Sequence, residues 1–127
     1  MNRVGAAVVG AVLIAAACGG SPTASEAGVP AGVALEIRLV ARDIAFAPVQ
    51  VGAPAGLPLH LVLDNQDDGV PHDIALMGAN GSTKLGATEI VTGPATVELD
   101  VPGLVPGIYQ LLCEVHPNMV TTLTVGG

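Results

Sequence analysis

The chain has 127 residues, which is enough for one domain with additional segments. Half of the residues are hydrophobic, but with one Phe, one Tyr and no Trp the core must be built from aliphatic side chains. The formal net charge of −7 argues against nucleic-acid binding, because phosphate recognition needs a basic surface.

The first segment is typical of an export signal. Arg3 precedes an uninterrupted apolar run over residues 4–17. This run is shorter than the ~20 residues of a membrane-spanning helix but suits the hydrophobic region of a signal peptide. It ends in three alanines before Cys18, which resembles the lipobox of bacterial lipoproteins. We therefore predict a lipoprotein signal peptide over residues 1–17 and lipidation of Cys18. An ordinary secretory signal cleaved near Cys18 is the alternative.

Residues 18–32 are predicted to be a flexible linker. They are rich in Gly, Ser, Pro, Ala and Thr, and Glu26 is their only charged residue. Such a composition cannot bury a core. We expect a folded domain over residues 33–127, held by lipid at the extracytoplasmic face of a bacterial membrane.

The domain itself shows short runs in which apolar and polar residues alternate. The apolar residues fall on odd positions in 33–39, 57–63 and 96–101, and Gly- and Pro-rich turns separate the runs. Further strand candidates are residues 49–51, 73–77, 89–92, 108–113 and 121–125. This pattern predicts an all-β fold, a Greek-key β-sandwich of seven or eight strands.

One short stretch concentrates metal-binding side chains. Cys113, His116 and Met119 follow each other at C-x2-H-x2-M spacing, and His72 begins a predicted strand upstream. Because Cys113 ends another predicted strand, neighbouring strands can bring His72 to the same end of the sandwich. Two imidazoles, a thiolate and a weak axial thioether are the ligands of a blue-copper electron-transfer site. We therefore predict that His72, Cys113, His116 and Met119 bind one copper ion.

With these ligands placed, the chain resembles a cupredoxin, the family of plastocyanin, amicyanin and pseudoazurin. Residues 65–72, which run from Asn65 to Pro71 and His72, are similar to the family's approach to its first ligand. Residues 106–113 match the pattern PGxYxxxC, and the ligand spacing is closest to that of amicyanin. The resemblance covers roughly residues 35–125 and implies a cupredoxin-like fold and an electron carrier.

One position departs from the family pattern. Many cupredoxins have Asn after the first His ligand, where its side chain helps to tie the two ligand segments together. This chain has Asp73 there, and an ionised carboxylate accepts hydrogen bonds but cannot donate them.

Two other candidate ligands have simpler explanations. His60 lies in the run 57–63 with the opposite parity to the leucines, so we expect it to face solvent. Met77 is an odd number of residues from His72 and is expected to pack rather than to bind metal. A Cys18–Cys113 disulfide is the alternative to separate roles for the two cysteines.

The predicted function is single-electron transfer between redox partners, not catalysis. Four protein ligands leave no open position for a substrate. Zinc is the main alternative metal, although it gains little from the thioether of Met119. A protein that captures, delivers or stores copper without redox turnover is the alternative function, and a copper-free binding module is a third.

The expected partner surface surrounds His116, which should be the ligand nearest solvent. An apolar docking patch is predicted from Val70, Pro71, Pro117 and Asn118, with Met119 as a further candidate. Nearby acids suggest a partner with a basic docking face: Asp64, Asp67, Asp68 and Glu114. We expect a monomer.

Overall fold

Regular structure in residues 32–127, the part of the chain that the computed structural model describes, consists of strands. The predicted signal peptide, the lipidation site Cys18 and the linker up to residue 31 lie outside the described residues. Within residues 32–127, no helix is long and apolar enough to cross a membrane.

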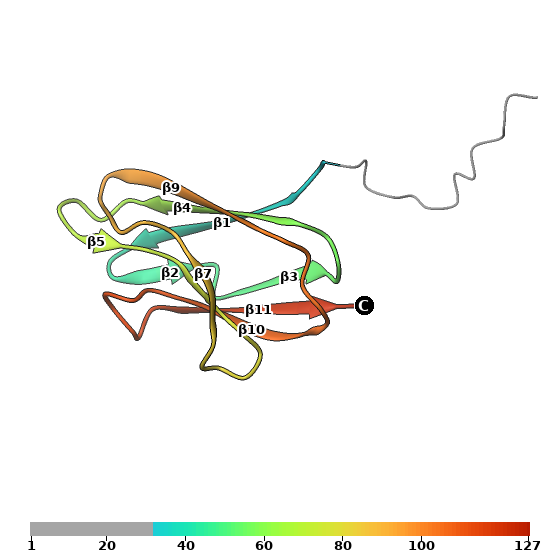
Figure 1. The fold of residues 1–127 in the computed structure, drawn as a ribbon. Helices are drawn as coiled ribbons and strands as arrows, with labels where there is room; N and C mark the ends of the chain where they lie inside the picture. The colour runs from blue at the N-terminus through green and yellow to red at the C-terminus, as the bar shows by residue number, and fades with distance from the viewer. Residues whose placement is uncertain (1–31) are drawn as a thin grey trace, which may run out of the picture. The chain divides into compact units, whose positions relative to one another are not determined.

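Two sheets face each other as the layers of a sandwich (Figure 1). The first has the strand order β2-β1-β4-β9, with bounds β1 Leu35–Arg42, β2 Ala45–Ala47, β4 Leu59–Asn65 and β9 Ala95–Val101. The second has the order β3-β11-β10-β6-β7, with bounds β3 Gln50–Pro54, β6 Ala75–Met77, β7 Lys84–Ala87, β10 Gly107–Leu112 and β11 Val120–Gly126. A separate pair joins β5 (Pro71–His72) to β8 (Val91–Thr92).

The core is aliphatic, as the composition predicts. Side chains from both sheets form one buried cluster, in which Leu39, Leu61, Leu63, Leu76, Leu111 and Leu123 are almost completely inaccessible. In β1 and β4 the leucines on odd positions point into this cluster, while Glu36 and Arg38 are exposed. Alternation of side chains across a strand explains why one face is buried and the other solvated. The predicted all-β sandwich is confirmed.

The strand count is the main difference from the prediction. Each of the eight predicted runs contains a strand, but the described residues form eleven strands because β2, β5 and β7 were missed. These three have two to four residues each, too few for an alternating pattern to be recognised. Their pairing depends on neighbours that only the folded chain supplies.

The sheet register places the candidate ligands at one end of the sandwich. The β10–β11 hairpin ends with the pair Leu112 and Val120, so residues 113–119 form its connecting loop. Strand β6 pairs with β10 through Ala75 and Leu112, which brings the segment just before β6 beside the start of that loop. His72 belongs to this segment.

Candidate metal centre

The loop between β10 and β11 is closed by its own backbone. The amide of Cys113 donates to the carbonyl of Met119 at 3.1 Å, and the amide of Met119 donates to the carbonyl of His116 at 2.9 Å. These bonds extend the hairpin by one step and fold residues 116–119 into a tight turn. The three candidate ligands of the loop are thereby held close to one another.

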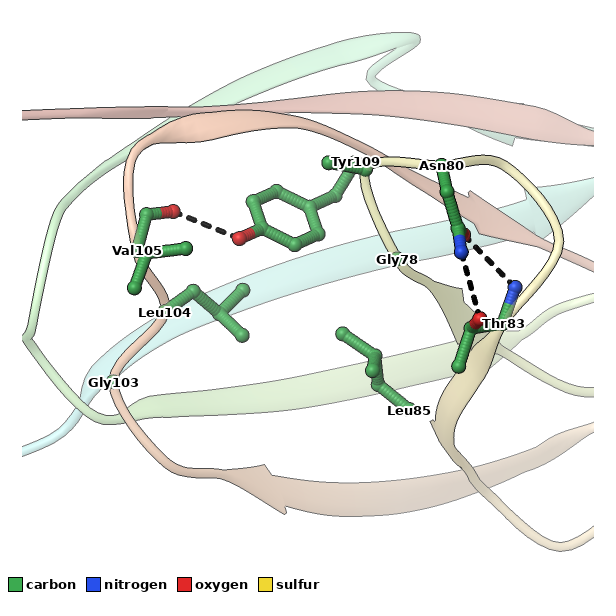
Figure 2. A pocket seen from close by; sticks show the side chains of 9 residues that line it. Gly78, Asn80, Thr83, Leu85, Gly103, Leu104, Val105 and Tyr109 are labelled. Atoms are coloured by element: carbon green, nitrogen blue, oxygen red, sulfur yellow. Dashed lines mark hydrogen bonds between the residues drawn. The ribbon is translucent and has the colours of Figure 1, made fainter.

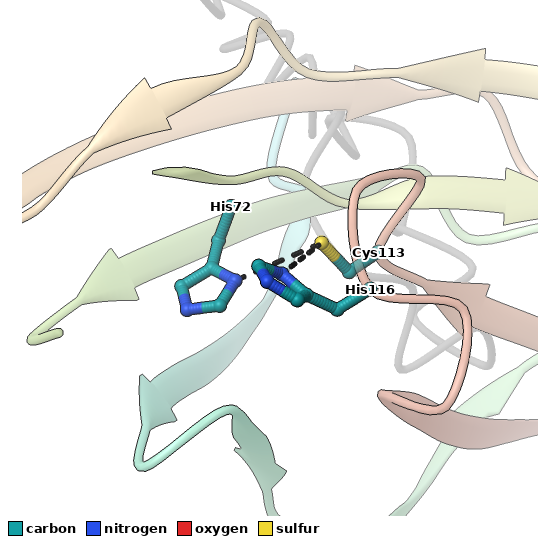
Figure 3. Close-up of side chains that lie close together, drawn as sticks. All are labelled: His72, Cys113 and His116. Atoms are coloured by element: carbon teal, nitrogen blue, oxygen red, sulfur yellow. Dashed lines mark hydrogen bonds between the residues drawn. The ribbon is translucent and has the colours of Figure 1, made fainter. Parts of the chain in front are cut away.

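A side-chain clamp fixes the second ligand segment against this loop. Asp73, next to His72, accepts a hydrogen bond from the amide of Glu114 at 2.7 Å. The tie between the two ligand segments is therefore present despite the Asp at this position, because an acceptor is all that this contact needs. Figure 3 shows the result, with His72 facing Cys113 and His116 across the gap between the segments.

Three donor atoms converge. The Sγ atom of Cys113 lies 3.7 Å from Nδ1 of His72 and 3.9 Å from Nδ1 of His116. The two rings are tilted by 56° with centroids 4.8 Å apart. Within residues 32–127, His72, Cys113 and His116 are the only three His, Cys, Asp or Glu side chains that meet in this way.

The two sulfur–nitrogen separations fit a metal ion. An ion with a thiolate at about 2.3 Å, an imidazole at about 2.05 Å and an angle of about 120° between the two bonds separates sulfur from nitrogen by about 3.8 Å. The two measured separations lie on either side of this value. Thiolate and imidazole ligands suit both zinc and copper, so the thioether of Met119 is the donor that favours copper.

Met119 completes the donor set in the same loop. Its side chain is buried at 2% exposure, and its backbone bonds join it to both Cys113 and His116. His72, Cys113, His116 and Met119 thus form a type 1 copper site arrangement, which confirms the predicted cofactor. Of the four, His116 alone is partly exposed.

The outer nitrogen of His72 contacts Asp67, one of the acids expected to steer a basic partner. Nε2 of His72 lies 2.7 Å from Oδ2 of Asp67. Burial alone would raise the pKa of Asp67, but hydrogen bonds from the amide of Ile44, from His72 and from the amide of Asp43 hold it below its ordinary value. The only sequence signal for this contact is a carboxylate five residues before the first His ligand.

Asn65, the first residue of the segment that resembles the family's approach to its first ligand, has a structural role. Its buried amide group donates to the carbonyls of Val70 (2.8 Å) and Val91 (2.9 Å), and its oxygen accepts from the amide of Asp67 at 3.0 Å. This single side chain therefore fixes the loop that carries Asp67 and leads to His72.

The carboxylate of Asp73 is only half satisfied. Its Oδ2 atom is buried without a hydrogen-bond partner within the described residues. Burial raises the pKa of the Asp73 carboxyl above its ordinary value, and the hydrogen bond from the Glu114 amide offsets this only in part. The unpartnered oxygen lies on the residue that follows a copper ligand.

The remaining candidates lie elsewhere. His60 points away from the core and contacts Asp100 at 2.6 Å, as expected of a surface histidine. Met77 is half-buried on β6.

An open cavity of about 510 Å³, shown in Figure 2, lies beside Leu85, Leu104 and Tyr109, and neither Cys nor His lines it. Its Tyr109 hydroxyl donates to the carbonyl of Val105 at 2.8 Å, so this ring is anchored rather than free.

Comparisons with known proteins agree with this geometry. The profile of a family described as a cupredoxin-like domain matches residues 8–125. Auracyanin A, a "blue" copper protein from Chloroflexus aurantiacus, superposes with a TM-score of 0.65 at 17% identity, covering 74% of this chain and 100% of that one. Amicyanin from Paracoccus versutus gives 0.52 at 24% identity, covering 78% and 86%.

The fold also occurs within a larger enzyme. A copper-containing nitrite reductase from Thermus scotoductus gives a TM-score of 0.54 at 19% identity, covering 73% of this chain but 23% of that one. No curated protein sequence matches this chain significantly. At these identities the structural likeness establishes the fold.

Proposed function

The chain belongs to the cupredoxin family, and on that premise we propose that it is a membrane-tethered blue copper protein that transfers single electrons between redox partners. The observation that carries the proposal is the convergence of the Cys113 thiolate with His72 and His116 at one end of a rigid sandwich. When bound there, copper supplies a Cu(I)/Cu(II) couple that accepts and releases one electron.

The four ligand residues differ in their exposure to solvent. The thiolate of Cys113, the Nδ1 atoms of His72 and His116 and the thioether of Met119 would hold the copper ion, the thioether as the weakest of the four ligands. Cys113, His72 and Met119 are buried and exclude water. His116 is partly exposed and gives the electron its path to the surface.

The proposed docking surface surrounds His116. Pro117 and Asn118 are exposed in the loop, while Val70 and Pro71 are half-buried in the segment before His72. Met119 is buried at 2% exposure, so the expectation that it adds to this surface is wrong. This surface is small and largely apolar, which suits a transient redox complex.

The acids near the docking surface are not equivalent. Asp67 is occupied by His72, and the carboxylate of Glu114 forms an ion pair with Lys84 at 3.1 Å. Asp68 is exposed, and Asp64 is half-buried and accepts a hydrogen bond from Gln66. The negative charge that is open to a basic partner therefore comes mainly from Asp64 and Asp68, because the Asp67 carboxylate is only 11% exposed and that of Glu114 is paired.

The tether and the location follow from the sequence. We place the mature protein at the extracytoplasmic face of a bacterial membrane, anchored by lipid on Cys18, as a monomer without enzymatic activity. Membrane fractionation of the native chain and of Cys18→Ala tests this placement. A native protein that carries no lipid would refute the anchor and leave the copper site unaffected.

The visible spectrum tests the main proposal. The full chain loaded with Cu(II) should absorb intensely in the red through charge transfer from the Cys113 thiolate, and Cys113→Ser should abolish the colour. A pale or colourless Cu(II) protein would overturn the assignment. A blue protein that exchanges its copper readily and cycles slowly would instead support copper capture or delivery.

A further inference from the structure

The side chain of Asp67 lies between a copper ligand and the turn that joins β1 to β2. Its Oδ2 atom is 2.7 Å from Nε2 of His72 and accepts the amide of Ile44 at 3.0 Å, while Oδ1 accepts the amide of Asp43 at 2.6 Å. The imidazole is completely buried and the carboxylate is 11% exposed. Three donors therefore converge on one carboxylate, two of them from a turn more than twenty residues away.

The backbone of Asp67 is held as firmly as its side chain. Its amide donates to Asn65, and its carbonyl accepts the amide of Val70 at 3.2 Å. Gly93 packs so closely that a Cβ atom there would lie 2.2 Å from the carbonyl oxygen of Asp67. Only glycine allows this approach, so the backbone of Gly93 packs directly against the loop that carries Asp67.

The turn that contacts Asp67 has an unfavourable backbone. Asp43 and Ile44 have φ angles of 53° and 54°, in the left-handed region. A β-branched residue such as Ile rarely adopts this conformation, and such strain persists only where the surroundings impose it. Here the strained turn aims two successive amides at the carboxylate of Asp67.

The contact also fixes which nitrogen of His72 faces the metal. Both oxygens of the Asp67 carboxylate already accept backbone amides, so the contact with His72 is made by a donating Nε2–H. Nδ1 then keeps its lone pair, and it is this atom that lies 3.7 Å from Sγ of Cys113. A carboxylate on the outer N–H of a ligating imidazole orients the ring and makes it a stronger electron donor.

We propose that Asp67 is a positioning residue for the copper ligand His72: its carboxylate, held by the strained β1–β2 turn, locks the ring with Nδ1 toward Cys113 and favours the oxidised state of the site. The orienting role concerns the copper site itself, whereas its importance for the reduction potential rests on the proposed electron-transfer function. Asp67 therefore belongs to the metal centre and not to the docking surface.

The first experiment measures the reduction potential of three full-length, copper-loaded proteins. Asp67→Asn removes the charge but keeps an oxygen that can accept Nε2–H, while Asp68→Asn removes the same charge one residue away at an exposed position. We expect Asp67→Asn to reduce the preference for Cu(II) over Cu(I) about tenfold, a rise of about 59 mV for a one-electron couple. Asp68→Asn should shift it far less. Equal shifts in the two variants would show that Asp67 acts only as a nearby charge. They would overturn the proposal that its contact with His72 favours the oxidised state.

The second experiment needs neither copper nor electron transfer. In the metal-free wild-type chain, nitrogen-15 NMR should show His72 protonated at Nε2, with that proton protected from solvent exchange, and Asp67→Ala should remove the protection. Asp67→Asn serves if the Ala variant does not fold, since the weaker acceptor should still shorten the proton's lifetime. A wild-type Nε2 proton that exchanges freely would overturn the positioning role, even for a protein that proves to be blue and redox-active.

Discussion

Two histidines of this domain contact a carboxylate at nearly the same distance, yet their surroundings differ. His60 lies 2.6 Å from Asp100 on the outer face of β4, where the imidazole is 29% and the carboxylate 87% exposed. His72 lies 2.7 Å from Asp67 with its ring completely buried. Water and salt screen the first pair, which is expected to contribute little to stability. The second pair is shielded and fixed by the chain around it.

The other ring nitrogen gives each histidine its role. In His60 it faces the carboxylate of Glu98 at 3.6 Å, so the ring is surrounded by negative charge and is suited to bind a proton. In His72 it faces the thiol sulfur of Cys113, so the ring is suited to bind a soft metal together with that sulfur. The chemistry of the two histidines therefore depends on burial and on the second neighbour, and the shared carboxylate contact does not decide it.

The largest effect is expected from replacing each of the two histidines in turn. His72→Ala should abolish the intense red absorption of the Cu(II)-loaded protein, because an open position in the ligand plane admits water. His60→Ala should leave the spectrum unchanged. Visible absorption of the full-length variants measures both, and circular dichroism confirms that each one folds. A blue His72→Ala protein would mean that His72 is not a ligand.

The two methionines provide a finer version of the same contrast. Met119 is buried in the ligand loop, whereas Met77 is half-buried on β6. Met119→Gln should retain copper but lower the reduction potential and perturb the spectrum, since a thioether favours Cu(I) over Cu(II). Met77→Gln is the matched control and should change neither. An unchanged potential in Met119→Gln would leave Met119 as a packing residue.

Local patterns in the sequence were sufficient for the features that depend on neighbours along the chain. Alternation in residues 35–39 and 59–63 predicted which leucines enter the core, and the spacing from Cys113 to Met119 predicted a compact loop of ligands. The position of His72 relative to Cys113 was also predictable, because one precedes and the other follows a predicted strand.

Features that depend on distant contacts were not predictable in this way. Asp67 looked like one of several surface acids, since its partners Asp43 and Ile44 precede it by more than twenty residues. That turn has a left-handed backbone but contains no glycine, the residue that usually indicates this conformation in a sequence. Strand β7 likewise forms only because β6 presents an edge to pair with. In each case the deciding interaction exists only in the folded chain.

Asp73 tests what burial does to a carboxylate that lacks a full set of partners. We expect Asp73→Asn to stabilise the copper-free chain at neutral pH by about 1 kcal/mol, because it removes a charge from a buried oxygen without a hydrogen bond. Asp68→Asn, at an exposed position, is the control and should have little effect. Urea unfolding followed by circular dichroism measures both variants.

The effect of Asp73→Asn should depend on pH with a defined sign. Burial raises the pKa of Asp73 in the folded state above its ordinary value of 3.8. Ionisation therefore destabilises the fold most above the folded-state pKa, and the penalty disappears as the pH falls toward 3.8. The advantage of the Asn variant should shrink over the same range. A difference that does not change with pH would assign the effect to packing.

The smallest expected effect belongs to His60. Its hydrogen bond to Asp100 is the main cause that raises the pKa of the His60 imidazole above 6.5, burial opposes the rise, and the charges of Asp100, Glu98 and Glu36 add to it. Arg38, also on β1, is paired with Glu36 at 3.6 Å and weakens the negative field. The folded state therefore binds a proton more tightly than the unfolded state does.

The sign of the pH dependence follows from this raised pKa. The contribution of His60 to stability should be complete below pH 6.5, the ordinary pKa of the group, and should be lost as the pH rises through the higher pKa of the folded state. Comparison of wild type with His60→Gln across this range by urea unfolding isolates it from His72 and His116, which both proteins retain. The difference should be small, because solvent screens an exposed pair. A stability difference that instead grows with pH would mean that His60 acts as a neutral acceptor on this sheet face and not as a cation.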